Sequence, residues 1–447
     1  MSKEKHQLGN EAIYDAKVLG WPRVIILGIQ HLFAMFGATV LVPILVTQQY
    51  GLPLSVQTTL FFAGVGTLIF HICSKLKVPA FLGSSFAFLG GFQAISELNV
   101  GKFANMSGEE KLPYALGGIV IAGAMYIILA LLFKMVGAKK VMRFFPPIVT
   151  GPMIILIGLN LAGSAVTNAS TCWPLALLSI AVIIAANIWG KGMIKIIPIL
   201  LGVVIPYIVA VCCGMVDFSA VGAEAIVGLP KFVLAKFDIT AILVMAPIAV
   251  ASMMEHIGDI SAISATCGKN FISDPGLHRT LLGDGLATSI AGMFGGPANT
   301  TYGENTGVLA LSRVYDPFVV RLAACFALAL SFSPMFDTLV NSIPTAIVGG
   351  VSFILYGMIS AVGVRNVVEN QVDLTKSRNL IIAAVILVCG LGFSAGVTFM
   401  VGGVAIKLTS LAIAAIAGVG LNAILPGNDY VFGEDAKGDG AANLGTY

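Results

Sequence analysis

The segment Asn299-Thr-Thr-Tyr-Gly-Glu-Asn-Thr-Gly-Val-Leu-Ala-Leu-Ser-Arg313 places a carboxylate, Glu304, among small and hydroxyl residues in a chain that is otherwise largely apolar. An acidic residue at the centre of a bilayer costs about 2.5–3.5 kcal/mol, so such residues face a cavity, a ligand or a partner. Gly296-Pro297 and Tyr302-Gly303 interrupt a helix, and we expect Gly307 to open a new one. Irregular backbone at membrane depth is tolerated only where protein or a cavity satisfies it. The segment therefore predicts a short extended piece that meets a helix N-terminus, where unpaired N–H groups point at a ligand.

The composition of the whole chain is that of a membrane protein. Of its 447 residues, 57% are hydrophobic and 11% are charged, whereas about 25% are charged in an ordinary soluble domain. The net charge of +3 includes no basic run suited to nucleic acid. Met1–Gly20 is polar and of mixed charge, so we expect no cleavable signal peptide. The seven cysteines show no metal-ligand spacing apart from the adjacent Cys212 and Cys213, so we expect no metal site.

Apolar stretches of spanning or near-spanning length occur fourteen times. They lie at about 24–46, 56–73, 79–95, 113–135, 145–163, 173–189, 194–216, 239–264, 280–294, 300–312, 318–334, 342–361, 380–396 and 404–425. The third and the tenth are short and rich in small residues, so we expect each to be an extended strand followed by half a helix. The pattern predicts an all-α polytopic membrane protein with fourteen transmembrane segments.

Lysine and arginine are distributed unequally between the two sides of these stretches. With both termini in the cytoplasm, 20 of the 25 Lys and Arg residues lie inside, as the positive-inside rule requires. The five left outside are Lys102, Lys111, Lys231, Lys236 and Lys407. An odd number of spans would abolish this asymmetry. We therefore expect residues 1–20 to be a cytoplasmic N-terminal segment and residues 426–447 a cytoplasmic tail, which is polar and disordered from Asn428 onward.

Matching motifs lie seven spans apart. Spans 1 and 8 each place a polar residue before a histidine, in Gln30-His31 and Glu255-His256. Spans 3 and 10 both begin with Pro-Ala, and spans 5 and 12 share a spacing of proline followed by glycines. Because seven is an odd number, the second copy is inverted in the membrane. We therefore expect two inverted repeats, 21–217 and 238–425.

Glu255 and Asp259 lie one turn apart on the same face of span 8. Two carboxylates this close repel each other when both are ionised, so the pair favours the retention of a proton, as a proton carrier requires. The alternative is that backbone groups or helix N-termini satisfy both carboxylates. His256 lies about 100° round the helix from Glu255. It therefore either packs or has a polar partner of its own.

Glu304, with Phe86 and Tyr302 of the two broken spans, outlines a ligand site at the interface between the repeats. An ionised carboxylate only accepts hydrogen bonds, so it selects a ligand with N–H donors, whereas free backbone N–H groups select carbonyl oxygens. Phe86 and Tyr302 can supply flat apolar faces, although Phe86 taken alone is equally typical of core packing. A flat heterocycle that alternates N–H and C=O groups, such as a pyrimidinedione, fits this pattern, whereas a sulfate or a sugar does not.

Five motifs in order resemble the nucleobase-ascorbate transporter family, and within it the bacterial uracil permeases. They are Gln30-His-Leu-Phe-Ala-Met-Phe-Gly-Ala-Thr-Val-Leu-Val-Pro43, Pro79-Ala-Phe-Leu-Gly-Ser-Ser-Phe-Ala-Phe88, Glu255-His-Ile-Gly258, Asp274-Pro-Gly-Leu-His-Arg279 and Asn299-Thr-Thr-Tyr-Gly-Glu-Asn-Thr-Gly307. The resemblance runs from about residue 21 to residue 425. It implies a core domain of spans 1–4 and 8–11 and a gate domain of spans 5–7 and 12–14. It also implies proton-coupled uptake of a nucleobase across the bacterial inner membrane, often by a dimer.

The resemblance assigns roles to individual residues. Those that it implies for substrate binding are Phe86, Glu255, Tyr302, Gly303 and Glu304. Those that it implies for the polar network that couples protonation to movement are His31, Glu255, Asp259 and Asn305. It implies no cofactor beyond H⁺ as the coupling ion. An integral-membrane enzyme is a further alternative, but no Ser/His/Asp set, metal cluster or phosphate loop occurs at membrane depth, so we expect no enzymatic activity.

Two positions depart from the family pattern. Ser312 replaces the threonine that precedes the basic residue, and Asp259 stands where some uracil permeases have a second histidine. Glu304 is similar to the residue of uracil permeases, whereas xanthine and urate carriers tend to have Gln. Uptake of uracil is therefore the expectation, and a proton symporter for xanthine or another purine is the alternative. An anion carrier would require a basic residue at the site, and spans 3, 8 and 10 offer none before Arg313.

Overall fold

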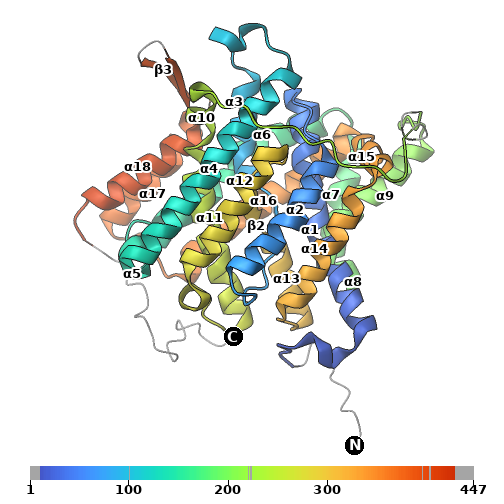
Figure 1. Cartoon of the computed structure of the whole chain (residues 1–447), viewed down its shortest axis with the longest axis horizontal. Helices are drawn as coiled ribbons and strands as arrows, with labels where there is room; N and C mark the ends of the chain where they lie inside the picture. The colour runs from blue at the N-terminus through green and yellow to red at the C-terminus, as the bar shows by residue number, and fades with distance from the viewer. Residues whose placement is uncertain are drawn as a thin grey trace, which may run out of the picture.

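The computed structural model describes residues 11–99, 101–219, 221, 224–394, 396–401 and 404–427, and helices follow the apolar stretches (Figure 1). The elements of the first half are α1 (Trp21–Tyr50), α2 (Val56–Cys73), β1 (Leu82–Ser84), the 3-10 helix η2 (Phe86–Phe88), α3 (Leu89–Ser96), α4 (Gly108–Val136), α5 (Ala138–Met142), α6 (Pro147–Ala169), α7 (Trp173–Ile188), α8 (Met193–Ile196) and α9 (Pro198–Cys212). Those of the second half are α10 (Ile239–Met245), α11 (Ile248–Cys267), α12 (Leu277–Phe294), β2 (Asn299–Thr301), α13 (Gly303–Ser312), α14 (Pro317–Ser331), α15 (Pro334–Asn341), α16 (Thr345–Glu369), α17 (Ser377–Gly392), β3 (Val397–Val401), β4 (Val404–Leu408) and α18 (Ser410–Ile424).

Local sequence explains where several helices begin and end. Ser107 and Glu110 form a capping box at the start of α4, in which each side chain accepts a hydrogen bond from the other residue's backbone N–H. The Asp316 side chain caps α14, and Pro317 occupies the first helical position, where no N–H is needed. Gly51 ends α1 with φ of 66°, a left-handed conformation that favours glycine.

The helices pack in two groups. In the first, α4 lies along α12 and α14 lies along α2 and α1, around the β1–β2 pair. The second group consists of α6, α7, α9, α16, α17 and α18. Its central pair, α6 and α16, approach closely at Gly158, where an added Cβ would overlap the backbone at Tyr356. Movement of one group against the other, as core and gate domains, stays a prediction.

Six of the described helices are long and apolar enough to cross a membrane, namely α1, α2, α4, α6, the continuous pair α10–α11, and α16. A seventh crossing results if α14 and α15, which meet at 89°, form one bent span. Shorter apolar helices of 10–17 residues, such as α7 and α9, occupy other predicted stretches. The chain is a predominantly helical, multi-pass membrane protein. Fourteen crossings in two inverted repeats stay a prediction.

Several boundaries predicted from the sequence are wrong. Residues 404–425 were expected to form one span, but 404–408 is strand β4, which pairs antiparallel with β3, and α18 begins only at Ser410. Valine, threonine, phenylalanine and isoleucine dominate this hairpin, and these residues favour strands as well as apolar spans. The stretch 318–334 also ends early, because its helix stops at Ser331 and α15 turns away. The tail from Asn428, predicted to be disordered, lies outside the described residues.

Gly307 does not open a helix. Instead α13 begins at Gly303 and continues through Gly307, immediately after the last β2 residue, Thr301, and the N-cap residue Tyr302. Strand β2 ends at Thr301, where its pairing with β1 ends, and helix α13 begins two residues later. The helix N-terminus therefore lies one turn earlier than predicted, and Glu304 is in its first turn.

Candidate functional site

Two short antiparallel strands form the base of the site. Leu82 pairs with Thr301, Gly83 with Thr300 and Ser84 with Asn299, and all of these residues are buried. Each strand then runs into a helix, β1 into η2 and α3, and β2 into α13. This confirms the prediction that both broken stretches combine a strand with half a helix. Neither η2 nor α13 has a side-chain cap at its N-terminus, so no N-cap side chain competes with a ligand for the first-turn N–H groups of α13.

Glu255 and Glu304 come to this base from two helices that pack together, α11 and α13. Both side chains are half-buried, and Oε2 of Glu255 has no hydrogen-bond partner among the described residues. Gly303, beside Glu304, is exposed. An unpartnered buried carboxylate oxygen carries a desolvation cost that a ligand N–H would remove. The carboxylates of Glu255 and Glu304 thus lie near the first-turn N–H groups of α13, so the site offers both acceptors and donors to a ligand.

Asp259 lies one turn after Glu255 on α11 and is held by strand β2. The Thr301 hydroxyl donates a hydrogen bond of 2.9 Å to its Oδ2 atom. Its Oδ1 atom faces Gly303, because a Cβ added to that glycine would lie 3.9 Å away. The prediction left open what satisfies this carboxylate, and Thr301 is the partner that sequence reasoning did not find.

The two predicted aromatic residues occupy different places. Phe86 makes an edge-to-face contact with Tyr356 of α16, with ring centroids 5.9 Å apart. Tyr302 is buried, and its hydroxyl donates to the Ser84 carbonyl oxygen at 2.9 Å. Its ring lies against β1, where an added Cβ on Gly83 would overlap with it. Tyr302 therefore supports the strand pair, whereas Phe86 lies where the two groups of helices meet.

His31 and Asn305 join the start of α13 to α1. The side-chain Nδ2 of Asn305 lies 3.1 Å from His31 Nδ1 and donates to the His31 carbonyl oxygen at 3.0 Å. An amide NH₂ group only donates, so it requires a lone pair on His31 Nδ1 and leaves the ring proton on Nε2. The structure thus brings together two residues of the predicted polar network across 274 positions of sequence.

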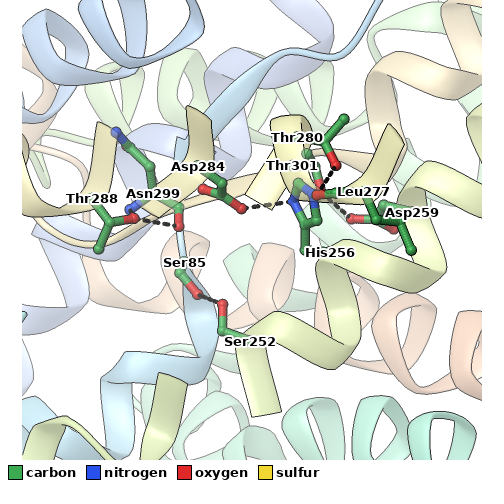
Figure 2. A network of polar contacts seen from close by, with 10 residues as sticks. All are labelled: Ser85, Ser252, His256, Asp259, Leu277, Thr280, Asp284, Thr288, Asn299 and Thr301. Atoms are coloured by element: carbon green, nitrogen blue, oxygen red, sulfur yellow. Dashed lines mark hydrogen bonds and ion pairs between the residues drawn. The ribbon is translucent and has the colours of Figure 1, made fainter. Parts of the chain in front are cut away.

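His256 has a partner that the sequence reasoning missed (Figure 2). Its Nδ1 atom lies 2.8 Å from Oδ2 of Asp284 on α12, and both side chains are completely buried. Next to this pair, the hydroxyls of Ser85 and Ser252 lie 3.4 Å apart and link the N-cap residue of η2 to α11. A lone acidic residue inside the apolar stretch 280–294 was the available signal for Asp284. In the described part of the chain, no group of three His, Cys, Asp or Glu side chains is arranged to hold a metal ion.

Comparison with known proteins agrees with this fold. A family model for xanthine and uracil permeases, described as "Permease family", matches residues 22–399. The chain belongs to this family, the nucleobase-ascorbate transporter family, whose members are permeases and not enzymes.

Individual relatives are uracil permeases. The chain is 41% identical to the uracil permease of Bacillus caldolyticus over 418 residues, which cover 90% of this chain and 92% of that one. It is 38% identical to the uracil permease of Bacillus subtilis over 445 residues (95% and 97%) and 37% identical to that of Escherichia coli K12 over 409 residues (89% and 90%).

Solved structures share the fold at low sequence identity. The transmembrane domain of the cyanobacterium bicarbonate transporter BicA is similar with a TM-score of 0.61 and 14% identity, over 89% of this chain and 96% of that one. SLC26A9 is similar with a TM-score of 0.61 and 13% identity, over 92% of this chain and 66% of that one. At these identities the likeness concerns the fold alone.

Proposed function

We propose that this protein takes up uracil together with a proton. The observation that carries the proposal is the meeting of Glu255 and Glu304 with the uncapped first turn of α13. Uracil has two N–H donors and two carbonyl acceptors in one plane. Its donors would face the two carboxylates, its carbonyl oxygens the backbone N–H groups from Gly303 onward, and its ring face Phe86. The names of the relatives support the same substrate.

In the proposed cycle, uracil and a proton bind to the α11–α13 site, and the group of helices that holds them then shifts against the α6–α16 group. Neutralising one carboxylate of the cluster lowers the cost of moving it through the membrane. One proton that moves down a potential of 100 mV supplies about 2.3 kcal/mol. At about 1.4 kcal/mol per factor of ten, this supports roughly 40-fold accumulation.

We further propose that both termini are cytoplasmic, that the bilayer is the bacterial inner membrane, and that the protein forms a homodimer.

Uptake into proteoliposomes tests the substrate and the coupling ion together. We expect labelled uracil to accumulate when an inward proton gradient is imposed in sodium-free buffer, because the site offers carboxylates to carry the proton. Excess unlabelled xanthine is expected not to compete, since Glu304 stands where xanthine carriers have Gln. Gradient-driven uptake of xanthine without uptake of uracil would keep the class of transporter and reject the proposed substrate.

A cross-link across the two groups of helices tests the proposed movement. The β3–β4 hairpin lies at the opposite end of the molecule from α5 (Figure 1). There, Lys407 Nζ of β4 is 3.1 Å from Oε2 of Glu97. The hairpin connects α17 to α18 of the second group, whereas Glu97 follows α3, which packs against α1 and α4 of the first group. Exposed ion pairs contribute at most about 1 kcal/mol, so this contact can open and close readily. Joining cysteines placed at 97 and 407 with a short, reducible bifunctional reagent is expected to stop uptake, and reduction is expected to restore it.

The matched control for this cross-link is a second ion pair whose residues both flank helices of the first group. Lys102 precedes α4, and its Nζ lies 2.8 Å from Oδ2 of Asp238, which caps α10. Helix α10 packs against α4 of the first group. Joining cysteines at 102 and 238 is expected to leave uptake intact, because these positions move together. Equal loss of uptake with both cross-links, or undiminished uptake with the 97–407 link, would contradict movement between the groups.

A further inference from the structure

Thr301, the last residue of β2, contacts Asp259 of α11 and lies two residues before the start of α13. We propose that Thr301 is a positioning residue for proton coupling, whose hydroxyl binds the ionised carboxylate of Asp259 and so links the protonation of α11 to the strand that leads into α13. This inference rests on the proposed function. It adds Thr301 as the residue that connects the protonation of Asp259 to α13, the helix that carries Glu304.

The geometry of β2 directs the Thr301 hydroxyl at α11. Its Oγ1 atom donates to Asp259 Oδ2 at 2.9 Å, and both side chains are buried. Successive side chains of a strand point to opposite faces, so the neighbouring Thr300 points away from Thr301. The Thr300 hydroxyl is also buried, but it has no hydrogen-bond partner among the described residues. Two adjacent threonines on one strand thus differ in this one contact.

Asp259 touches the strand with one oxygen and faces the helix with the other. Gly303, whose added Cβ would lie 3.9 Å from Oδ1, is the first residue of α13, and Glu304 follows it. One residue further on, Asn305 is bound to His31 of α1. The segment 301–305 is therefore held at both ends, by the contact of Thr301 with Asp259 and by that of Asn305 with His31. Glu304 lies between these two contacts, so protonation of Asp259 would alter one of the contacts that position it.

The charged groups around Asp259 come from four helices. They are Glu255 on α11, Glu304 on α13, Asp284 with its partner His256 on α12, and Arg365 on α16, which is 3.4 Å from Glu369. Three of these groups are carboxylates, and Arg365 is a cation. Within the described residues, the Thr301 hydroxyl is the donor in direct contact with the Asp259 carboxylate.

A donated hydrogen bond favours the ionised carboxylate over the protonated one. Removing the Thr301 hydroxyl should therefore let Asp259 hold its proton to higher pH. When Asp259 takes up a proton in the intact protein, the same bond weakens, and β2 loses one of the contacts that hold it against α11. The protonation state of Asp259 therefore affects how firmly β2 is held, and β2 leads into α13, the helix that carries Glu304.

The experiment compares the pH dependence of uracil uptake by proteoliposomes at a fixed membrane potential. Thr301→Val is expected to move the pH midpoint upward by about one to two units, the size that one charge-assisted hydrogen bond corresponds to. Thr301→Ser keeps the hydroxyl and is expected to keep the midpoint. Thr300→Val is the matched control, because it removes a buried hydroxyl from the same strand without touching Asp259. In an Asp259→Asn background, Thr301→Val is expected to cause no further shift.

If Thr301→Val does not fold, Thr301→Cys replaces it, since a thiol is a weak donor of similar size and should produce an intermediate shift. A wild-type midpoint in the Val or Cys variant would overturn the role of Thr301. Equal shifts in Thr301→Ser or Thr300→Val would also overturn it, because they would assign the effect to packing. Absence of gradient-driven uptake by the unmodified protein would instead overturn the proposed function, and the inference with it.

Discussion

Replacing Glu304 with Gln is expected to weaken uracil binding by about 10- to 100-fold, the size expected for one hydrogen bond to a charged group. Glu304 is half-buried in the uncapped first turn of α13, next to the exposed Gly303. Glutamine keeps the volume of the side chain, but its one amide oxygen is a neutral and weaker acceptor for the ligand's N–H donors than a carboxylate. Equilibrium binding of labelled uracil to the purified protein measures the change.

Glu109→Gln is the matched control for this substitution. Glu109 also lies in the first turn of a helix, α4, but it is exposed and belongs to no site. It is expected to bind uracil as the unmodified protein does. Unchanged binding by Glu304→Gln would show that uracil binds elsewhere, even if the protein transports it.

Replacing His256 with Leu is expected to lower the free energy of unfolding by about 3–5 kcal/mol, because it leaves the Asp284 carboxylate buried without its partner. The pair joins α11 to α12 at 2.8 Å, and neither side chain is exposed. Since α11 carries Glu255 and Asp259, loss of the pair should also disturb the site. Thermal unfolding in detergent, with and without uracil, measures both effects.

The double variant His256→Leu with Asp284→Leu separates the charge from the packing. Replacing both members of a buried ion pair with apolar residues is often close to neutral, so the double variant is expected to regain more than half of the lost stability. A double variant that loses the sum of the two single effects would mean that His256 and Asp284 contribute independently, as ordinary packing residues.

Much of the site was predictable because its signals are local. Glycine and proline mark where the third and tenth stretches leave the helical conformation, and both stretches do contain a strand before their helix. Carboxylates stand out in an apolar chain, so Glu255, Asp259 and Glu304 were identifiable from residue type alone. The β3–β4 hairpin was missed because its residues are as typical of an apolar span as of a strand.

The starting point of α13 was also missed, for a different reason. A glycine at Gly303 or at Gly307 is equally compatible with a helix start. The choice between them depends on where β2 stops pairing with β1, and β1 lies more than two hundred residues earlier in the chain. Pairing across that separation leaves no mark in the local sequence, yet it sets the turn of the helix on which Glu304 lies.

By itself, the sequence determined that this is a multi-pass membrane protein of a permease family, with two interrupted spans and three carboxylates. Hydropathy, the interruption of a helix by glycine or proline, and residue type are properties of each segment, so they can be recognised without knowledge of the fold. Only the tertiary structure decided the partners: Asp284 for His256, Asn305 for His31 and Thr301 for Asp259. A hydrogen bond or an ion pair depends on a separation of about 3 Å, and which side chains come that close is set by the packing of distant helices.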